Sequence, residues 1–120
     1  MADVLKRTVR AFVQLEQNEL TMYGQEYLDS DRTFTESVHQ RAVLLTNMTS
    51  FSEFDITNVD TPALLFLEND RAVTIALNTT ANAVTLADAG FIMMYGTFTG
   101  VYVKNENTTY TATVELVVTD

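Results

Sequence analysis

The chain has 120 residues, with one His, no Cys, and 7 Lys and Arg against 16 Asp and Glu. Its length is that of one domain with a sizeable core, and the lack of Cys excludes thiol catalysis, disulfides and Cys-ligated metal sites. The net charge of −9 opposes a phosphate backbone, so we expect no nucleic-acid partner.

Residues 5–16 alternate largely between apolar and polar side chains, as in a half-buried strand. A helix is the alternative, since apolar residues also recur at helical spacing, at Leu5, Val9, Phe12, Val13 and Leu20. We favour the strand, because residues 8–13 include branched and aromatic side chains and no convincing N-cap precedes the segment. The segment is therefore predicted to be a long N-terminal strand or arm.

The segment that follows is less regular. Residues 24–37 are polar, and we predict either a long connection or an outlying β-ribbon. The apolar run 41–46 is a strand candidate that can begin at Val38. Residues 49–62 mix Phe and Ile with polar residues and one Pro, which leaves a strand and a short helical turn as alternatives.

Short apolar runs separated by turn residues fill the second half of the chain. They cover residues 63–67, 72–77, 83–87, 91–95 and 101–103. The polar residues between the first two runs predict a hairpin. The last run, residues 109–119, alternates most clearly. The face predicted to be buried consists of Tyr110, Ala112, Val114, Leu116 and Val118.

Strands at this spacing, without helical segments between them, indicate antiparallel pairing. We predict an all-β fold: an antiparallel, jelly-roll-like β-sandwich with a long N-terminal strand or arm. The single domain is expected to span residues 1–120. Residues 1–48 would hold the N-terminal strand or arm and the long connection, and residues 49–120 the core strands.

Few residues could carry catalysis or bind a metal. His39 is the one side chain with an ordinary pKa near neutrality, and its neighbours form no nucleophile motif. Asp29-x-Asp31 and Asn69-Asp70 do not continue into a calcium loop, and the four Gly fit no phosphate-binding loop. We therefore expect no catalytic residue, no cofactor and no metal, and a function other than catalysis.

The N-terminal part is the more basic, since residues 1–41 hold five of the seven Lys and Arg. Residues 4–16 or the closing strand would offer a docking edge, because both are long and carry few charges on one face. Met and Tyr are favoured at interfaces, which draws attention to residues 91–95. The candidate partner-binding residues are Lys6, Arg7, Arg10, Phe12, Met93, Met94, Tyr95 and Tyr102.

The sequence also bears on the compartment. A basic segment followed by an apolar core does not open the chain, and no apolar run is long enough to cross a bilayer. We therefore expect neither a signal peptide nor a membrane-spanning segment.

Four features follow one another over residues 60–120. They are an apolar run ending in Asn69-Asp70, a second ending in Leu77-Asn78, a Thr-rich strand before Gly90, and the closing segment 100–119. In this order they resemble small β-rich virion structural proteins of tailed bacteriophages. The resemblance implies a capsid decoration or cement protein, a head fibre, or a tail or collar component, without catalytic residues. It also implies other virion proteins as partners, namely major capsid or tail proteins, together with a homo-oligomer and a location in the virion after assembly in the host cytoplasm.

Two other functions are open from the sequence. A carbohydrate- or receptor-binding module would stack sugar rings on exposed aromatic residues such as Tyr95, Tyr102 or Tyr110, beside Asp and Asn in a shallow pocket. A small hydrolase would use two close carboxylates in a cleft, one of them with a raised pKa.

Overall fold

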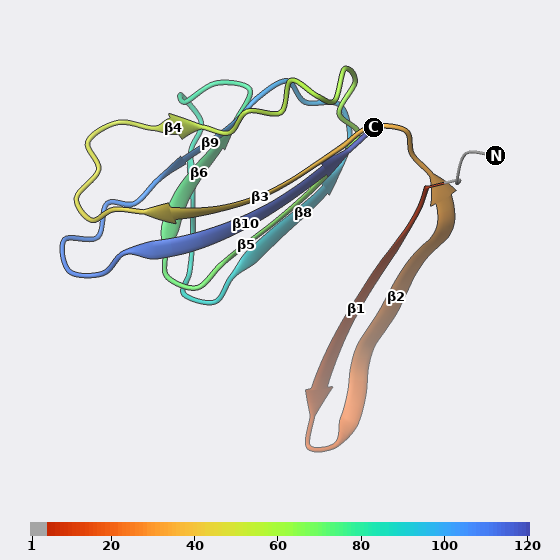
Figure 1. Ribbon diagram of the computed structural model, residues 1–120. Helices are drawn as coiled ribbons and strands as arrows, with labels where there is room; N and C mark the ends of the chain where they lie inside the picture. Colours follow the sequence, from red (N-terminus) through yellow and green to blue (C-terminus); the bar gives the residue numbers. More distant parts are fainter. Residues whose placement is uncertain (1–4) are drawn as a thin grey trace. The chain divides into compact units, whose positions relative to one another are not determined.

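The computed structural model describes residues 5–120, and every regular element in this range is a β-strand (Figure 1). The strands are β1 Lys6–Gln17, β2 Leu20–Thr33, β3 Ser37–Leu44, β4 Ser52–Glu53, β5 Leu64–Asn69, β6 Val73–Leu77, β7 Val84–Leu86, β8 Phe91–Tyr95, β9 Val101–Lys104 and β10 Ala112–Thr119. The prediction of an all-β fold is confirmed. Within residues 5–120, no helix is long and apolar enough to span a membrane.

The chain divides into two compact units, residues 1–35 and residues 36–120. The expected N-terminal part ends at residue 48. In the structure β3 belongs to the second unit, because it pairs along its whole length with β10. The N-terminal unit is therefore shorter than the expected strand and connection together.

The first unit is a long antiparallel hairpin of β1 and β2. A strand over residues 5–16 is confirmed, and of the two alternatives for residues 24–37 the β-ribbon is correct as far as Thr33. Asn18 and Glu19 form the two-residue turn, with φ of 51° and 66°. Two successive positive φ values define the hairpin turn whose twist matches that of the strands.

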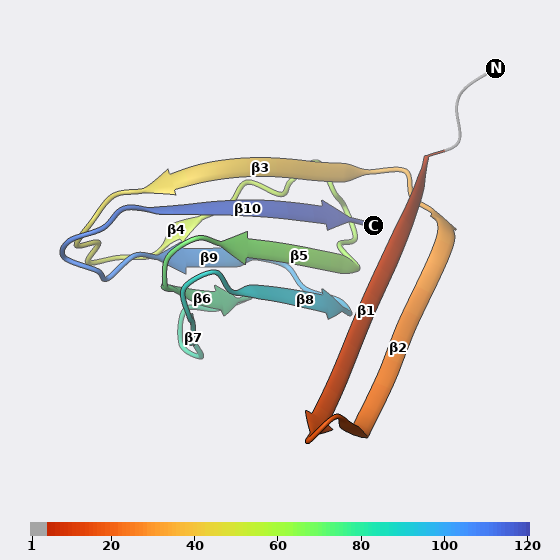
Figure 2. The same ribbon diagram turned by 90° about the horizontal axis from the view of Figure 1, so that it is seen from below.

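The second unit is a sandwich of two four-stranded antiparallel sheets. One sheet has the order β3-β10-β5-β8, and Figure 2 shows these four strands side by side. The other has the order β4-β9-β6-β7. Successive strands along the chain mostly lie in different sheets, so the hairpin predicted for residues 63–77 is wrong: β5 and β6 belong to opposite sheets. The closing strand β10 is not a docking edge either, because it pairs with β3 on one side and β5 on the other.

The core lies between the two sheets. The inward residues of β10, Ala112, Val114, Leu116 and Val118, are fully buried, as the alternation predicted. They meet inward residues of the facing sheet such as Val73, Ile75 and Val103 in one cluster. Burial of apolar surface from both sheets is the main stabilising term for such a sandwich.

Residues 49–62 contain one short strand, β4, and then leave the sheet. Phe54, Ile56 and Val59 are buried in the core cluster, so this loop closes one end of the sandwich. Its mixed sequence reflects this role, since single apolar side chains point inward from an irregular backbone. Pro62 is also buried, whereas most of the polar side chains of this loop face water.

Candidate functional site

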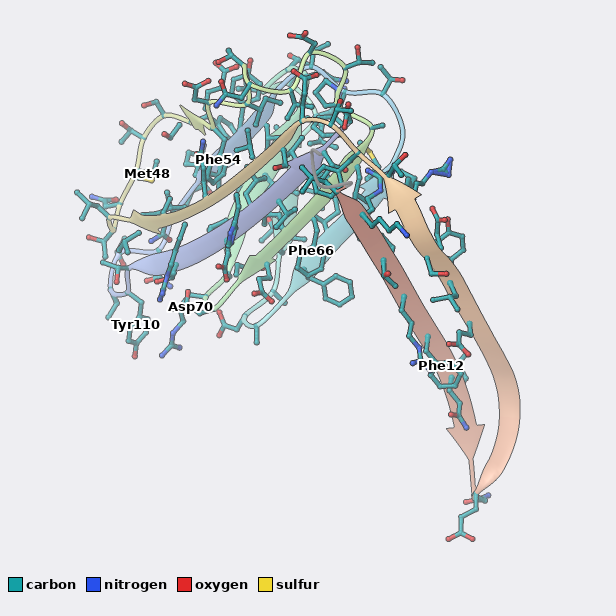
Figure 3. All side chains as sticks on the ribbon, turned by 45° about the vertical axis from the view of Figure 1, so that its right-hand side comes forward. Phe12, Met48, Phe54, Phe66, Asp70 and Tyr110 are labelled. Atoms are coloured by element: carbon teal, nitrogen blue, oxygen red, sulfur yellow. The ribbon has the colours of Figure 1, made fainter. Side chains whose placement is uncertain are left out.

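The hairpin exposes large apolar side chains, and they lie on both of its faces. Phe12 and Leu28 share one face, since β1 and β2 place Arg10 opposite Leu28 and Phe12 opposite Glu26. Leu15 and Tyr27 lie on the other face by the same alternation. Phe12 is 60% exposed and Leu28 58% exposed, and Figure 3 shows Phe12 projecting from the hairpin.

Among the residues that the structure describes, this unit is a single two-stranded sheet with no second sheet or helix of its own. Isolated hairpins are at best marginally stable in water, and three strands or a covering element are normally required. Exposed apolar surface is typical of sites that bind another protein. A ribbon with apolar residues on both faces is therefore suited to binding between two protein surfaces. Phe12, which the sequence singled out, is therefore placed where a partner could cover it.

The basic residues of the hairpin are partly neutralised. Arg10 Nε lies 2.8 Å from Glu26 Oε1, and Arg32 Nη1 lies 3.5 Å from Asp29 Oδ2. Both pairs are exposed, and exposed pairs contribute little to stability. Lys6 and Arg7 lie at the open end of the hairpin, opposite Thr33 and Arg32, and the Arg10–Glu26 pair lies about midway along it. We expected a basic docking surface on the N-terminal part. The hairpin instead presents basic and acidic side chains side by side.

A second exposed apolar surface lies on the outer face of the β3-β10-β5-β8 sheet. We call Phe66, Phe91, Met93 and Tyr95 the β8 patch. The registers place Phe66 opposite Met93, and the rings of Phe66 and Phe91 lie with centroids 6.0 Å apart. Phe91 is 64% exposed. Met94 does not belong to the patch, because its side chain points to the other side of the sheet and packs against the core.

The tyrosines considered for sugar stacking lie apart. Tyr95 is on β8, whereas Tyr102 is on β9 in the opposite sheet. The Tyr102 ring covers Gly100, where its Cε2 lies 3.1 Å from the position that a Cβ would take. One face of the Tyr110 ring is covered by the Arg71 guanidinium, 4.3 Å from the ring centroid. The structure therefore does not bring these three rings to one surface.

A hollow of about 660 Å³ lies at the end of the sandwich closed by residues 53–62 and 97–99. Its lining includes the carboxylates Glu53, Asp55 and Asp60. Asp55 Oδ1 accepts hydrogen bonds from the Thr57 hydroxyl at 2.7 Å and the Thr57 N–H at 3.1 Å. These bonds hold the pKa of Asp55 below its ordinary value of 3.8, the opposite of the raised pKa that a general acid requires.

Two further polar contacts involve Glu36 and His39. Glu36 Oε1 accepts a hydrogen bond from the Asp60 N–H at 3.2 Å. His39 Nε2 lies 2.9 Å from Glu115 Oε1, in an exposed pair that joins β3 to β10. Across residues 5–120 no group of three or more His, Asp or Glu is placed to hold a metal ion.

Comparisons with known proteins add no relative. No protein-family model matches the chain. No curated protein and no solved structure matches it either.

Proposed function

We propose that this protein is a non-enzymatic structural component of a bacteriophage particle, and that it docks to a capsid or tail protein through its N-terminal hairpin. The observation that carries the proposal is the hairpin itself. It is a separate unit, a single two-stranded sheet whose described side chains include exposed apolar residues on both faces. Binding between two protein surfaces would bury both faces and supply the missing stability.

The strand order supports a virion protein. Eight strands form two four-stranded sheets, with β3-β10-β5-β8 facing β4-β9-β6-β7. This order agrees with a jelly roll, in which two Greek keys fold over each other, and jelly rolls are common in viral capsid proteins and in lectins. The virion reading is preferred to a carbohydrate-binding module because Tyr95, Tyr102 and Tyr110 share no face.

The distribution of charge supports docking through the hairpin. Residues 36–120 hold 3 Lys and Arg against 10 Asp and Glu, a net charge of −7, whereas residues 1–35 hold 4 against 6, a net charge of −2. A strongly acidic sandwich favours solubility and repels other acidic surfaces. The hairpin is the less charged unit, and a partner surface can approach it at lower electrostatic cost.

Co-sedimentation with purified particles tests the proposal. The particles are those of the phage that encodes the chain, prepared without the protein and mixed with it afterwards. The variants are Phe12→Asp and Leu28→Asp, which place a charge on one face of the hairpin. Val43→Asp is the matched control, because Val43 is 62% exposed on β3 of the sandwich.

We expect wild-type protein and Val43→Asp to sediment with the particles, and both hairpin variants to lose at least about tenfold in affinity, as for an apolar contact near the centre of an interface. Equal binding by all four proteins would show that the hairpin does not dock. No binding by wild-type protein, at concentrations where it is folded, would refute the virion role.

A further inference from the structure

The sandwich has four edge strands, and they differ in protection. Proteins protect exposed edges by shortness, charge or proline. β4 has two residues and β7 three, and β3 carries His39 and Arg41. β8, Phe91–Tyr95, has five residues with neither charge nor proline. The edge of β8 is therefore the least protected of the four.

Hydrogen bonds between β5 and the ends of β8 show which backbone groups of β8 face the edge of the sheet. Asn69 N–H donates to Gly90 O at 3.1 Å, and Gly96 N–H donates to Ala63 O at 2.9 Å. Residues 90 and 96 thus face β5, and in an antiparallel pair the orientation alternates along the strand. The N–H and C=O groups of Phe91 and Met93 consequently point away from β5, toward the open edge.

We propose that β8 pairs, antiparallel, with β8 of a second copy of this chain, about a twofold axis at Met93. The sequence of β8 indicates that the partner strand is a second β8. An aromatic residue lies two positions to either side of Met93, at Phe91 and Tyr95. An antiparallel copy centred there places Phe91 of each chain opposite Tyr95 of the other. Aromatic cross-strand pairs are favourable, and a twofold interface uses the same patch on both partners.

Charge also favours a second copy at this edge. Two molecules of net charge −9 repel each other, so they associate best where each presents an uncharged surface. The β8 patch carries no charged side chain, and Phe66 extends it onto β5, where Glu68, opposite Phe91, borders it. Pairing would join the two β3-β10-β5-β8 sheets into one continuous eight-stranded sheet with an apolar stripe across the junction.

This proposal is separate from docking through the hairpin. The dimer uses β8 in the sandwich, and the particle contact uses β1 and β2. A variant that removes one interaction is expected to leave the other, so the failure of one proposal is visible independently of the other.

Light scattering of the full chain across a concentration series is the first test. We expect the mass to rise from 13.4 kDa toward twice that value. Met93→Lys places two positive charges together at the axis, so we expect a monomer throughout. Val43→Lys, an equivalent change at the opposite edge of the same sheet, is expected to dimerise like wild type. A wild-type monomer at millimolar concentration, or a Met93→Lys dimer, would overturn the proposal.

A proline variant distinguishes loss of pairing at the β8 edge from unfolding of the sandwich. The Met93 N–H points away from β5, so Met93→Pro removes no hydrogen bond between β5 and β8, and proline is tolerated on edge strands in that orientation. We expect the far-ultraviolet circular dichroism of wild type with loss of the dimer. A folded Met93→Pro protein that still dimerises through the same concentration range would contradict pairing at this edge.

Mixing two variants tests the register. Phe91→Lys and Tyr95→Glu should each weaken the dimer about tenfold, because each loses both aromatic pairs. In an equimolar mixture, the introduced lysine of one chain lies opposite the introduced glutamate of the other, and the second aromatic pair is retained. We expect a heterodimer tighter than either homodimer. A mixture no tighter than its components would overturn the antiparallel arrangement centred on Met93.

Discussion

Asn105, at the end of β9, is completely buried, and its side chain holds the loop that leads to β10. Its Nδ2 donates to Tyr110 O at 2.9 Å and to Leu44 O at 3.4 Å. Its Oδ1 accepts a hydrogen bond from the Asn107 N–H at 3.1 Å. One amide therefore ties the β9–β10 loop to itself and to the end of β3.

Asn105→Ala removes all three hydrogen bonds. The two shorter bonds are worth about 1 kcal/mol each, and a buried partner left unsatisfied costs about 1–3 kcal/mol. Leu44 is buried, so its carbonyl cannot easily take up water, whereas Tyr110 is half exposed and its carbonyl can. The free energy of unfolding should fall by about 2–4 kcal/mol, a large share of the stability of a domain of this size.

Urea denaturation followed by circular dichroism measures this loss, and Asn107→Ala is the matched control. Asn107 Oδ1 accepts hydrogen bonds from the N–H groups of Thr109 and Tyr110 at 2.7 and 3.0 Å, but the site is exposed, so water replaces the amide and the loss should stay below about 1 kcal/mol. Equal losses for the two variants would refute the argument from burial. A loss below about 1 kcal/mol for Asn105→Ala would do the same.

Three further predictions concern the core, the hairpin turn and the acid side of the stability profile. Leu67→Ala, at a fully buried position of β5, should cost about 2–5 kcal/mol in urea denaturation, and a cost near zero would contradict the described core. Glu19→Gly, at φ 66°, should stabilise the hairpin by about 1 kcal/mol, seen as slower amide exchange in β1 and β2, and unchanged exchange would contradict the turn geometry. The pKa of Asp55 is lower in the folded chain than its ordinary 3.8, so its stabilising effect is present above that pH and is lost as pH falls through the lower folded value. The difference in Tm between wild type and Asp55→Ala should therefore shrink on acidification, and a difference that grew would reverse the sign.

The closing strand shows what the sequence could predict. Residues 109–119 alternate, and from Ala112 to Val118 β10 is buried on the face that the alternation indicates. Tyr110, expected on the same face, lies before β10 and is 50% exposed, so the prediction is wrong at that residue. The sequence of residues 5–16 fits both a strand and a helix, and the structure explains why. The hairpin carries apolar residues on both faces, with Phe12 opposite in orientation to Val9 and Leu15, so its pattern departs from simple alternation.

The errors come from interactions between distant segments. The polar residues after β5 are typical of a turn. The next strand can then either pair with β5 or cross to the other sheet, and the strands beside β5 decide between the two. Here β10 and β8 occupy its two sides, and Asp70 Oδ1 accepts a hydrogen bond from the Thr113 N–H at 2.7 Å. Local sequence carries no signal for such a partner 43 positions away.

The turn at Asn18-Glu19 was also missed. Gly is the usual signal for a positive φ in a two-residue hairpin loop, and this turn has none. Among the candidate contact residues, the sequence identified Phe12, Met93 and Tyr95 as surface positions. It placed Met94 with them because neighbouring Met residues cannot be assigned to a face until the register with β5 is known.

Hydrogen–deuterium exchange of the free and particle-bound protein tests the central claim most directly, because it reports which unit the partner covers. The account predicts fast exchange for the amides of β1 and β2 in the free protein and strong protection on the particle, with β10 protected in both states. A hairpin that exchanges equally fast in both states, with new protection confined to the sandwich, would contradict docking through the hairpin.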